Sequence, residues 1–78
     1  MTVKLCIPVK LRDYRELAKA LREEGLEYTT HPSILKGYNA VVVIPVRSKD
    51  EAYRLGNYIV KTLLPALKLW YWVKTDER

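Results

Sequence analysis

Two stretches of the chain alternate between apolar and polar residues. In residues 2–9 the apolar side chains stand at every second position, namely Val3, Leu5, Ile7 and Val9. A repeat of two is typical of a β-strand with one buried face, so we predict a strand over residues 2–9. Near the end of the chain the same repeat predicts a last strand, with Leu69, Tyr71 and Val73 on one face and Trp70, Trp72 and Lys74 on the other. The repeat does not decide which of these faces is buried, because a slip of one residue exchanges them.

Two shorter stretches predict the remaining strands. Leu26, Tyr28 and Thr30 alternate with polar residues until the His-Pro-Ser sequence of residues 31–33. Because proline is confined largely to edge strands, we predict that this strand lies at the edge of a sheet and ends at Pro32. Residues 40–44 are apolar and mostly β-branched, which is typical of a central strand, and Pro45 marks its expected end.

Two segments have the pattern of helices. Asp13 with Glu16 has the spacing of a capping box, and the apolar residues that follow fall on one helical face, so we predict a helix over residues 13–24 that ends at Gly25. Ser48 with Glu51 has the same spacing and predicts the start of a long second helix. Its inward stripe is formed by Ala52, Leu55, Ile59, Leu63 and Leu67. Pro65 is expected to kink or end this helix.

The order of the predicted elements is β-α-β-β-α-β. Right-handed crossovers then place both helices on one face of a four-stranded antiparallel sheet, with the first and third strands in the centre. We therefore predict an α+β, ferredoxin-like fold for a single domain of residues 1–78, with a short frayed polar tail at 75–78. The other face of the sheet is left open, and we expect it to carry Lys4, Cys6, Val41, Val43 and one alternation of the last strand.

Composition and charge restrict the class of protein. The chain has 78 residues, of which 49% are hydrophobic and 29% are charged, as in a globular domain with one core. Its net charge of +5 favours an anionic partner. No apolar run approaches the roughly 20 residues of a membrane span, and the first ten residues lack the pattern of a secretory signal, so we expect a cytoplasmic protein. The absence of Gln and the abundance of charge are typical of a thermophilic source.

The sequence contains little that predicts catalysis. Cys6 is the only cysteine and His31 the only histidine, so we expect no disulfide, no metal site and no cofactor. No nucleophile elbow or phosphate loop occurs, so we expect a protein that is not an enzyme. His31 is expected to be a turn residue, and Cys6 a buried or interface residue. A dimer cleft that combines His31, Tyr38 and arginines is the enzymatic alternative.

Basic residues recur at helical spacing in both predicted helices. The first stripe contains Arg12, Arg15, Lys19 and Arg22, and the second contains Arg54, Asn57 and Lys61. Spacings of three and four place each set on one exposed face, where it can bind phosphates without sequence preference. The alternative is a solvated face on which Arg12 pairs with Glu16 and Lys19 with Glu23.

Residues 36–43, Lys-Gly-Tyr-Asn-Ala-Val-Val-Val, resemble the third-strand octamer of the RNA-recognition motif family. Lys36, Gly37, Tyr38 and Val41 match that pattern, whereas Ala40 and Val43 stand where the family has aromatic residues. The resemblance implies RNA binding on the sheet, with Lys36 on phosphate and Tyr38 on a base. The alternative is that Lys36 and Gly37 only form the entry to a hairpin.

These observations lead to two compatible hypotheses. We expect a small basic module that binds RNA or DNA through the helix stripes and through Lys36 and Tyr38. The alternative is a homodimer, structural or regulatory, that pairs through an apolar sheet face. We favour the combination of the two, in which the paired sheet faces leave the basic helices facing outward. The residues expected at that interface are Val41, Val43, Trp70 and Trp72.

Overall fold

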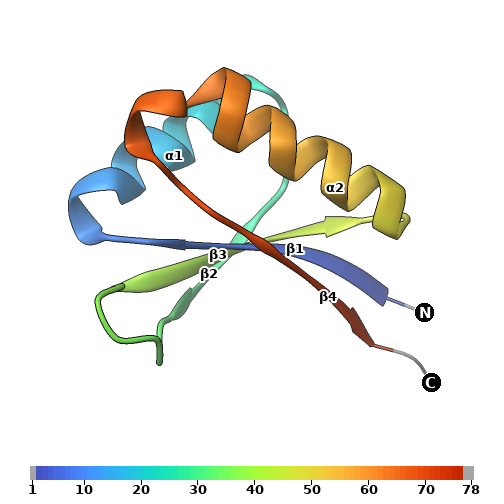
Figure 1. Ribbon diagram of the computed structural model, residues 1–78, viewed down its shortest axis with the longest axis horizontal. Helices are drawn as coiled ribbons and strands as arrows, with labels where there is room; N and C mark the ends of the chain where they lie inside the picture. The colour runs from blue at the N-terminus through green and yellow to red at the C-terminus, as the bar shows by residue number, and fades with distance from the viewer. Residues whose placement is uncertain (1, 77–78) are drawn as a thin grey trace.

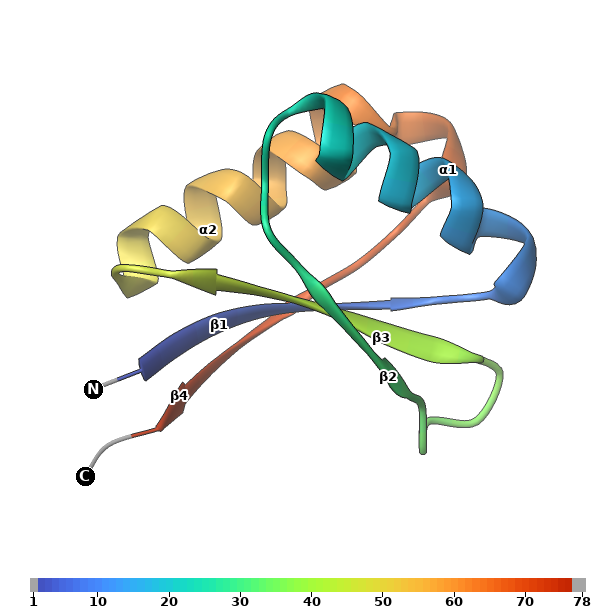
Figure 2. The same ribbon diagram turned by 180° about the vertical axis from the view of Figure 1, so that it is seen from behind.

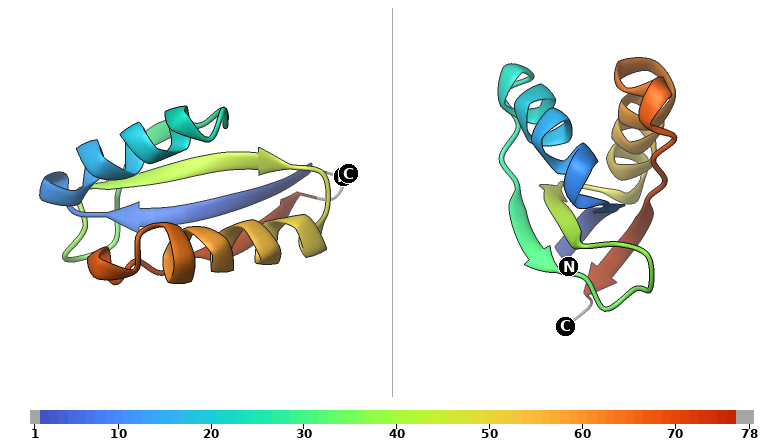
Figure 3. Two further views of the ribbon diagram at one scale, coloured as in Figure 1. Left: turned by 90° about the horizontal axis from the view of Figure 1, so that it is seen from above. Right: turned by 90° about the vertical axis from the view of Figure 1, so that its left-hand side faces the viewer.

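The computed structural model describes residues 2–76 and has an α+β fold. A four-stranded antiparallel sheet is covered on one face by two helices, and the other face is open (Figures 1 and 3). The elements in chain order are β1 (Thr2–Val9), α1 (Leu11–Glu23), β2 (Thr29–Pro32), β3 (Ala40–Val46), α2 (Lys49–Asn57), the π-helical turn η1 (Tyr58–Leu63), the 3-10 turn η2 (Pro65–Leu67) and β4 (Trp72–Asp76). The expected sheet with two helices is confirmed.

β1 lies in the middle of the sheet, whose strand order is β2-β3-β1-β4. Its bounds are those predicted from the alternation, because Val3, Leu5, Ile7 and Val9 all face the helices and are buried. They pack with Leu17 and Leu21 of α1, Val42 and Ile44 of β3, and Ala52 and Ile59 of the second helical segment. In the register of the sheet, Cys6 lies opposite Val43 of β3 on one side and Trp72 of β4 on the other.

Two prolines lie within the central strands. The prediction that Pro45 ends the third strand is wrong, because β3 continues to Val46 and Pro45 pairs in register with Lys4. β2 accompanies β3 only as far as Val43, so β3 is an edge at Pro45 and the missing N–H removes no bond to β2. Pro8 stands in the same situation, because β4 accompanies β1 only along residues 2–6.

The start of α1 differs from the prediction. The helix begins at Leu11, and Asp13 lies in its first turn instead of capping it. The N–H of Leu11 donates to Oδ1 of Asn39, 2.7 Å away, and the N–H of Asn39 donates to the carbonyl of Val9. A residue from the β2–β3 connection therefore satisfies the amide that a local cap would normally satisfy. The predicted end is confirmed, since Gly25 follows the helix with a φ of +73°.

The second helix begins as predicted and ends before Pro65. Oγ of Ser48 accepts from the N–H of Glu51 at 3.1 Å, which confirms Ser48 as the N-cap. After α2 the chain widens into η1, where the N–H of Leu64 donates to the carbonyl of Ile59. Gly56 is buried against the ring of Tyr71, a contact that the sequence pattern did not predict.

Two strands are displaced from their predicted positions. β2 begins at Thr29, later than the predicted start at Leu26, whereas its end at Pro32 and its edge position are confirmed. β4 runs from Trp72 to Asp76 instead of over residues 69–74. Thr75 lies opposite Val3, so the prediction of a frayed tail is wrong at Thr75 and Asp76. The rest of that predicted tail, residues 77–78, lies outside the described residues.

Candidate functional site

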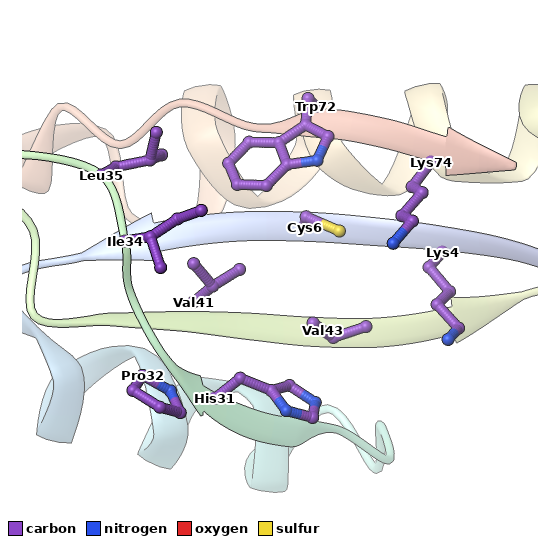
Figure 4. Close-up of a pocket in the computed structure, with 10 residues that line it drawn as sticks. All are labelled: Lys4, Cys6, His31, Pro32, Ile34, Leu35, Val41, Val43, Trp72 and Lys74. Carbon is purple, nitrogen blue, oxygen red and sulfur yellow. The ribbon is translucent and has the colours of Figure 1, made fainter.

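The open face of the sheet carries a groove of about 400 Å³ (Figure 4). Cys6, Val41 and Val43 form its floor on β1 and β3. Trp72 of β4 lies along one side, and His31 of β2 along the other. Apolar side chains from the β2–β3 connection, Ile34 and Leu35, stand at one end. That connection lies on the side of the sheet away from the helices (Figure 2), and Ile34 is fully exposed.

Two lysines stand at the other end of the groove. Lys4 and Lys74 are directly opposite each other in the register of β1 and β4, and Figure 4 shows both side chains on the open face. Like charges directly opposite each other in an antiparallel pair are destabilising, so this pair does not serve the stability of the sheet. Among the described residues that line the groove, Lys4 and Lys74 are the only lysines, and none is arginine, aspartate or glutamate. This end of the groove therefore attracts an anion.

Cys6 is buried at the bottom of the groove. Its exposed fraction is 4%, although it lies on the open face, because its neighbours in register, Val43 and Trp72, stand on both sides of it. Burial raises the pKa of the Cys6 thiol, and the charges of Lys74 and Lys4 oppose the rise without cancelling it. The thiol is therefore protonated at neutral pH and behaves as an apolar part of the floor.

Three aromatic rings form a row at the edge of the open face. The rings of Trp72 and Trp70 are 5.5 Å apart and tilted by 40°, and those of Trp70 and Tyr38 are 6.0 Å apart and edge to face. Nε1 of Trp70 donates to the hydroxyl of Tyr38 at 2.6 Å, which holds the two rings together. Trp70 remains 42% exposed. The row supplies flat apolar surface next to the lysines of the groove.

The basic stripes of the helices lie away from this groove. Arg12, Arg15 and Arg22 line a hollow on α1, where Nη1 of Arg22 donates to the hydroxyl of Tyr28. Within residues 2–76, Nε of Arg12 lies 3.9 Å from Oδ1 of Asp13, and no ion pair joins Arg12 to Glu16. In the same part of the chain Lys19 makes no ion pair with Glu23, and both residues are exposed.

The second stripe lies on α2 and η1. Arg54 lines a hollow beside Leu26 and Tyr58, and Lys61 is exposed on η1. The carboxylate of Glu24 raises the pKa of Tyr58, so the end of α1 places an acidic residue next to this stripe. The hollow beside α1 and the hollow beside α2 have no lining residue in common.

The residues of the octamer that resembles the RNA-recognition motif family do not lie on one surface. Lys36 is exposed in the β2–β3 connection and does not line the groove. Ala40, which stands at an aromatic position of the octamer, pairs with Val9 and packs against the helices. Tyr38 belongs to the aromatic row, while Val41 and Val43 lie on the groove floor with Trp72, as expected for the open face.

The part of the site that sequence reasoning missed is the pairing of Lys4 with Lys74. Lys4 was expected on the open face, but its neighbour on β4 depends on where that strand begins. Once β4 starts at Trp72, alternation places Lys74 on the same face as Trp72. The sequence shows that each lysine occupies a polar position of an alternating stretch. It does not show that the two lysines lie opposite each other in the sheet.

Comparison of the sequence with models of known protein families gives no match, and neither does comparison with curated proteins. Within residues 2–76, no helix is long and apolar enough to cross a membrane. The same residues contain no cluster of histidine, cysteine and acidic side chains that could hold a metal ion.

Proposed function

We propose that the protein is a small non-enzymatic binding module that binds nucleic acid through the open face of its sheet. The observation that carries the proposal is the groove that combines the Trp72 ring with the ammonium groups of Lys4 and Lys74. A nucleotide joins a flat apolar base to a phosphate, and its recognition needs an aromatic face beside a cation. The order of the elements and the strand order β2-β3-β1-β4 support assignment to the ferredoxin-like class.

This proposal moves the binding site from the helices to the sheet. The hollows beside the helix stripes contain Tyr14 and Tyr58, but neither hollow places an indole ring beside two lysines, as the groove does. Such stripes add favourable, salt-dependent attraction to any polyanion, and we assign them that supporting role. The groove supplies a separate contact for each part of a nucleotide, the Trp72 ring for the base and the two lysines for the phosphate.

The homodimer is the alternative, and the apolar floor of Val41 and Val43 favours it. A two-fold pairing of the open faces would also bury Lys4 and Lys74. Among the described residues that line the groove there is no carboxylate, so no acidic side chain of the groove would pair with these lysines across such an interface. We therefore favour an anionic ligand. If the faces nevertheless pair, sedimentation will detect a dimer that Val43→Glu converts to a monomer.

The test is an anisotropy titration of labelled single-stranded RNA and DNA across a salt series. The two variants compared are K4E/K74E on the sheet and R15E/K19E on α1, which change the net charge equally. Because K4E/K74E removes the groove cations beside the stacking ring, we expect it to weaken binding by about ten-fold more than R15E/K19E does.

Two outcomes would count against the proposal. If R15E/K19E weakens binding as much as K4E/K74E, the sheet has no special role and the helix stripe carries the interaction. If the wild-type protein binds neither oligonucleotide at low salt, the nucleic-acid function itself is wrong. Circular dichroism of both variants serves as the control for folding.

A further inference from the structure

A second cationic cleft lies at the opposite end of β1 from the lysine pair. It has a volume of about 280 Å³ and is formed where the β1–α1 junction, the β2–β3 connection and the segment before β4 meet. Lys10 and Arg12 line it from the junction, and Lys68 lines it from the segment before β4. Its acidic residue, Asp13, is already in contact with Arg12. Lys10 and Lys68 therefore leave the cleft with a net positive charge.

The aromatic row connects this cleft to the groove. Trp70 and Tyr38 line the cleft, and the ring of Trp70 is also packed against Trp72, which lines the groove. The two cationic ends are separated by the length of β1 from Lys4 to Lys10, which is about 20 Å at the rise of a strand. Cationic side chains therefore lie at both ends of the aromatic row, with Lys4 and Lys74 at one end and Lys10 and Lys68 at the other.

We infer that the groove and the cleft form one continuous track for single-stranded nucleic acid, in which Lys10 and Lys68 bind a phosphate several nucleotides away from the one at Lys4 and Lys74. This inference rests on the proposed function and deepens it. Rings in a row can stack on unpaired bases, whereas the bases of a duplex are already stacked on one another. The track therefore selects single strands over duplexes, and it is longer than one dinucleotide.

The experiment compares oligonucleotides of increasing length, measured by isothermal titration with unlabelled oligothymidylate and oligouridylate. We expect wild-type affinity to rise by about ten-fold or more from the dinucleotide to the hexanucleotide, as additional bases and phosphates are bound. K10E/K68E should abolish this gain and leave dinucleotide affinity nearly unchanged. The matched variant R47E/K49E, which has the same change in charge at exposed residues outside the groove, the cleft and the helix stripes, should keep the gain.

The possible failures are distinguishable. A gain that persists in K10E/K68E would remove the cleft from the track and leave the groove as the site. An equal affinity of the wild-type protein for a duplex hexamer and for the single strand would overturn the selection of single strands. No binding at any length would refute the proposed function itself. If K10E/K68E does not fold, K10Q/K68N is the replacement, because asparagine tolerates the left-handed backbone of Lys68, whose φ is +53°.

Discussion

Replacing Gly56 with alanine should destabilise the protein, although the same change stabilises most helices. Alanine is favoured over glycine in a helix interior by about 1 kcal/mol. At Gly56, however, the new Cβ would lie 2.7 Å from Cε2 and Cζ of Tyr71, well inside van der Waals contact. The ring cannot move freely, because the hydroxyl of Tyr71 donates to Oδ1 of Asn57 at 2.9 Å.

The size of the effect follows from these opposing contributions. Overpacking of a core costs about 1–3 kcal/mol, and a strained or lost hydrogen bond costs about 0.5–1.5 kcal/mol. After the gain in helix propensity is subtracted, we expect G56A to lower the free energy of unfolding by about 0.5–3.5 kcal/mol. In a chain of this size, each kcal/mol corresponds to a fall of about 4–8 °C in Tm.

Urea unfolding followed by circular dichroism tests this reasoning. The control repeats the substitution in a Tyr71→Ala background, where the ring is absent and G56A should be stabilising by about 1 kcal/mol. A change of sign between the two backgrounds identifies the ring as the cause. A stabilising effect of G56A in the wild-type background would refute the packing argument, because it would mean that Tyr71 moves aside at no cost.

Two further predictions concern residues that position the site. Asn39→Ala removes the acceptor of the first amide of α1, so it should destabilise the protein by about 0.5–2 kcal/mol in urea unfolding, whereas Asn39→Asp keeps the acceptor; equal stability of all three proteins would contradict this role. Burial raises the pKa of the Cys6 thiol above its ordinary value of 9.0. The protonated thiol therefore contributes fully to stability below pH 9.0, and this contribution is lost as the pH rises through the pKa of the folded protein. The wild-type protein should therefore lose stability relative to Cys6→Ala above pH 9.0, and parallel pH profiles would show that the thiolate is tolerated.

The sequence predicts those parts of the fold that depend on local patterns. β1 has the predicted bounds because a single buried face imposes the repeat of two on residues 2–9. Ser48 caps its helix because the acceptor and the amide are three residues apart. Gly25 ends α1 because a positive φ is cheap for glycine alone. In each case the prediction depends on a pattern of residues that are close together in the chain.

The incorrect predictions involve contacts between distant residues. Asn39 satisfies the first amide of α1 from 28 positions away, so the local spacing of Asp13 and Glu16 placed the start of the helix too late. β4 begins three residues later than predicted because the alternation continues through Leu69 to Asp76, and only the pairing with β1 decides which part joins the sheet.

The candidate site was predictable in part. The floor residues Val41 and Val43 follow from the alternation of a central strand whose other face meets the helices. The row of Tyr38, Trp70 and Trp72 joins two segments 32 residues apart through one hydrogen bond, which no local pattern shows. The cleft at the other end of β1 is formed by three segments and has no sequence pattern at all.

Nucleic acid is proposed to make its main contacts with the open face of the sheet and not with the helices. Titration of the ¹⁵N-labelled protein with a single-stranded hexanucleotide, followed by amide and indole chemical shifts, tests it most directly. We predict that the largest shifts occur at Lys4, Val43, Lys74 and the indole groups of Trp70 and Trp72, while Arg15 and Lys19 of α1 change little. Largest shifts at Arg15 and Lys19, with the open face unchanged, would contradict the account.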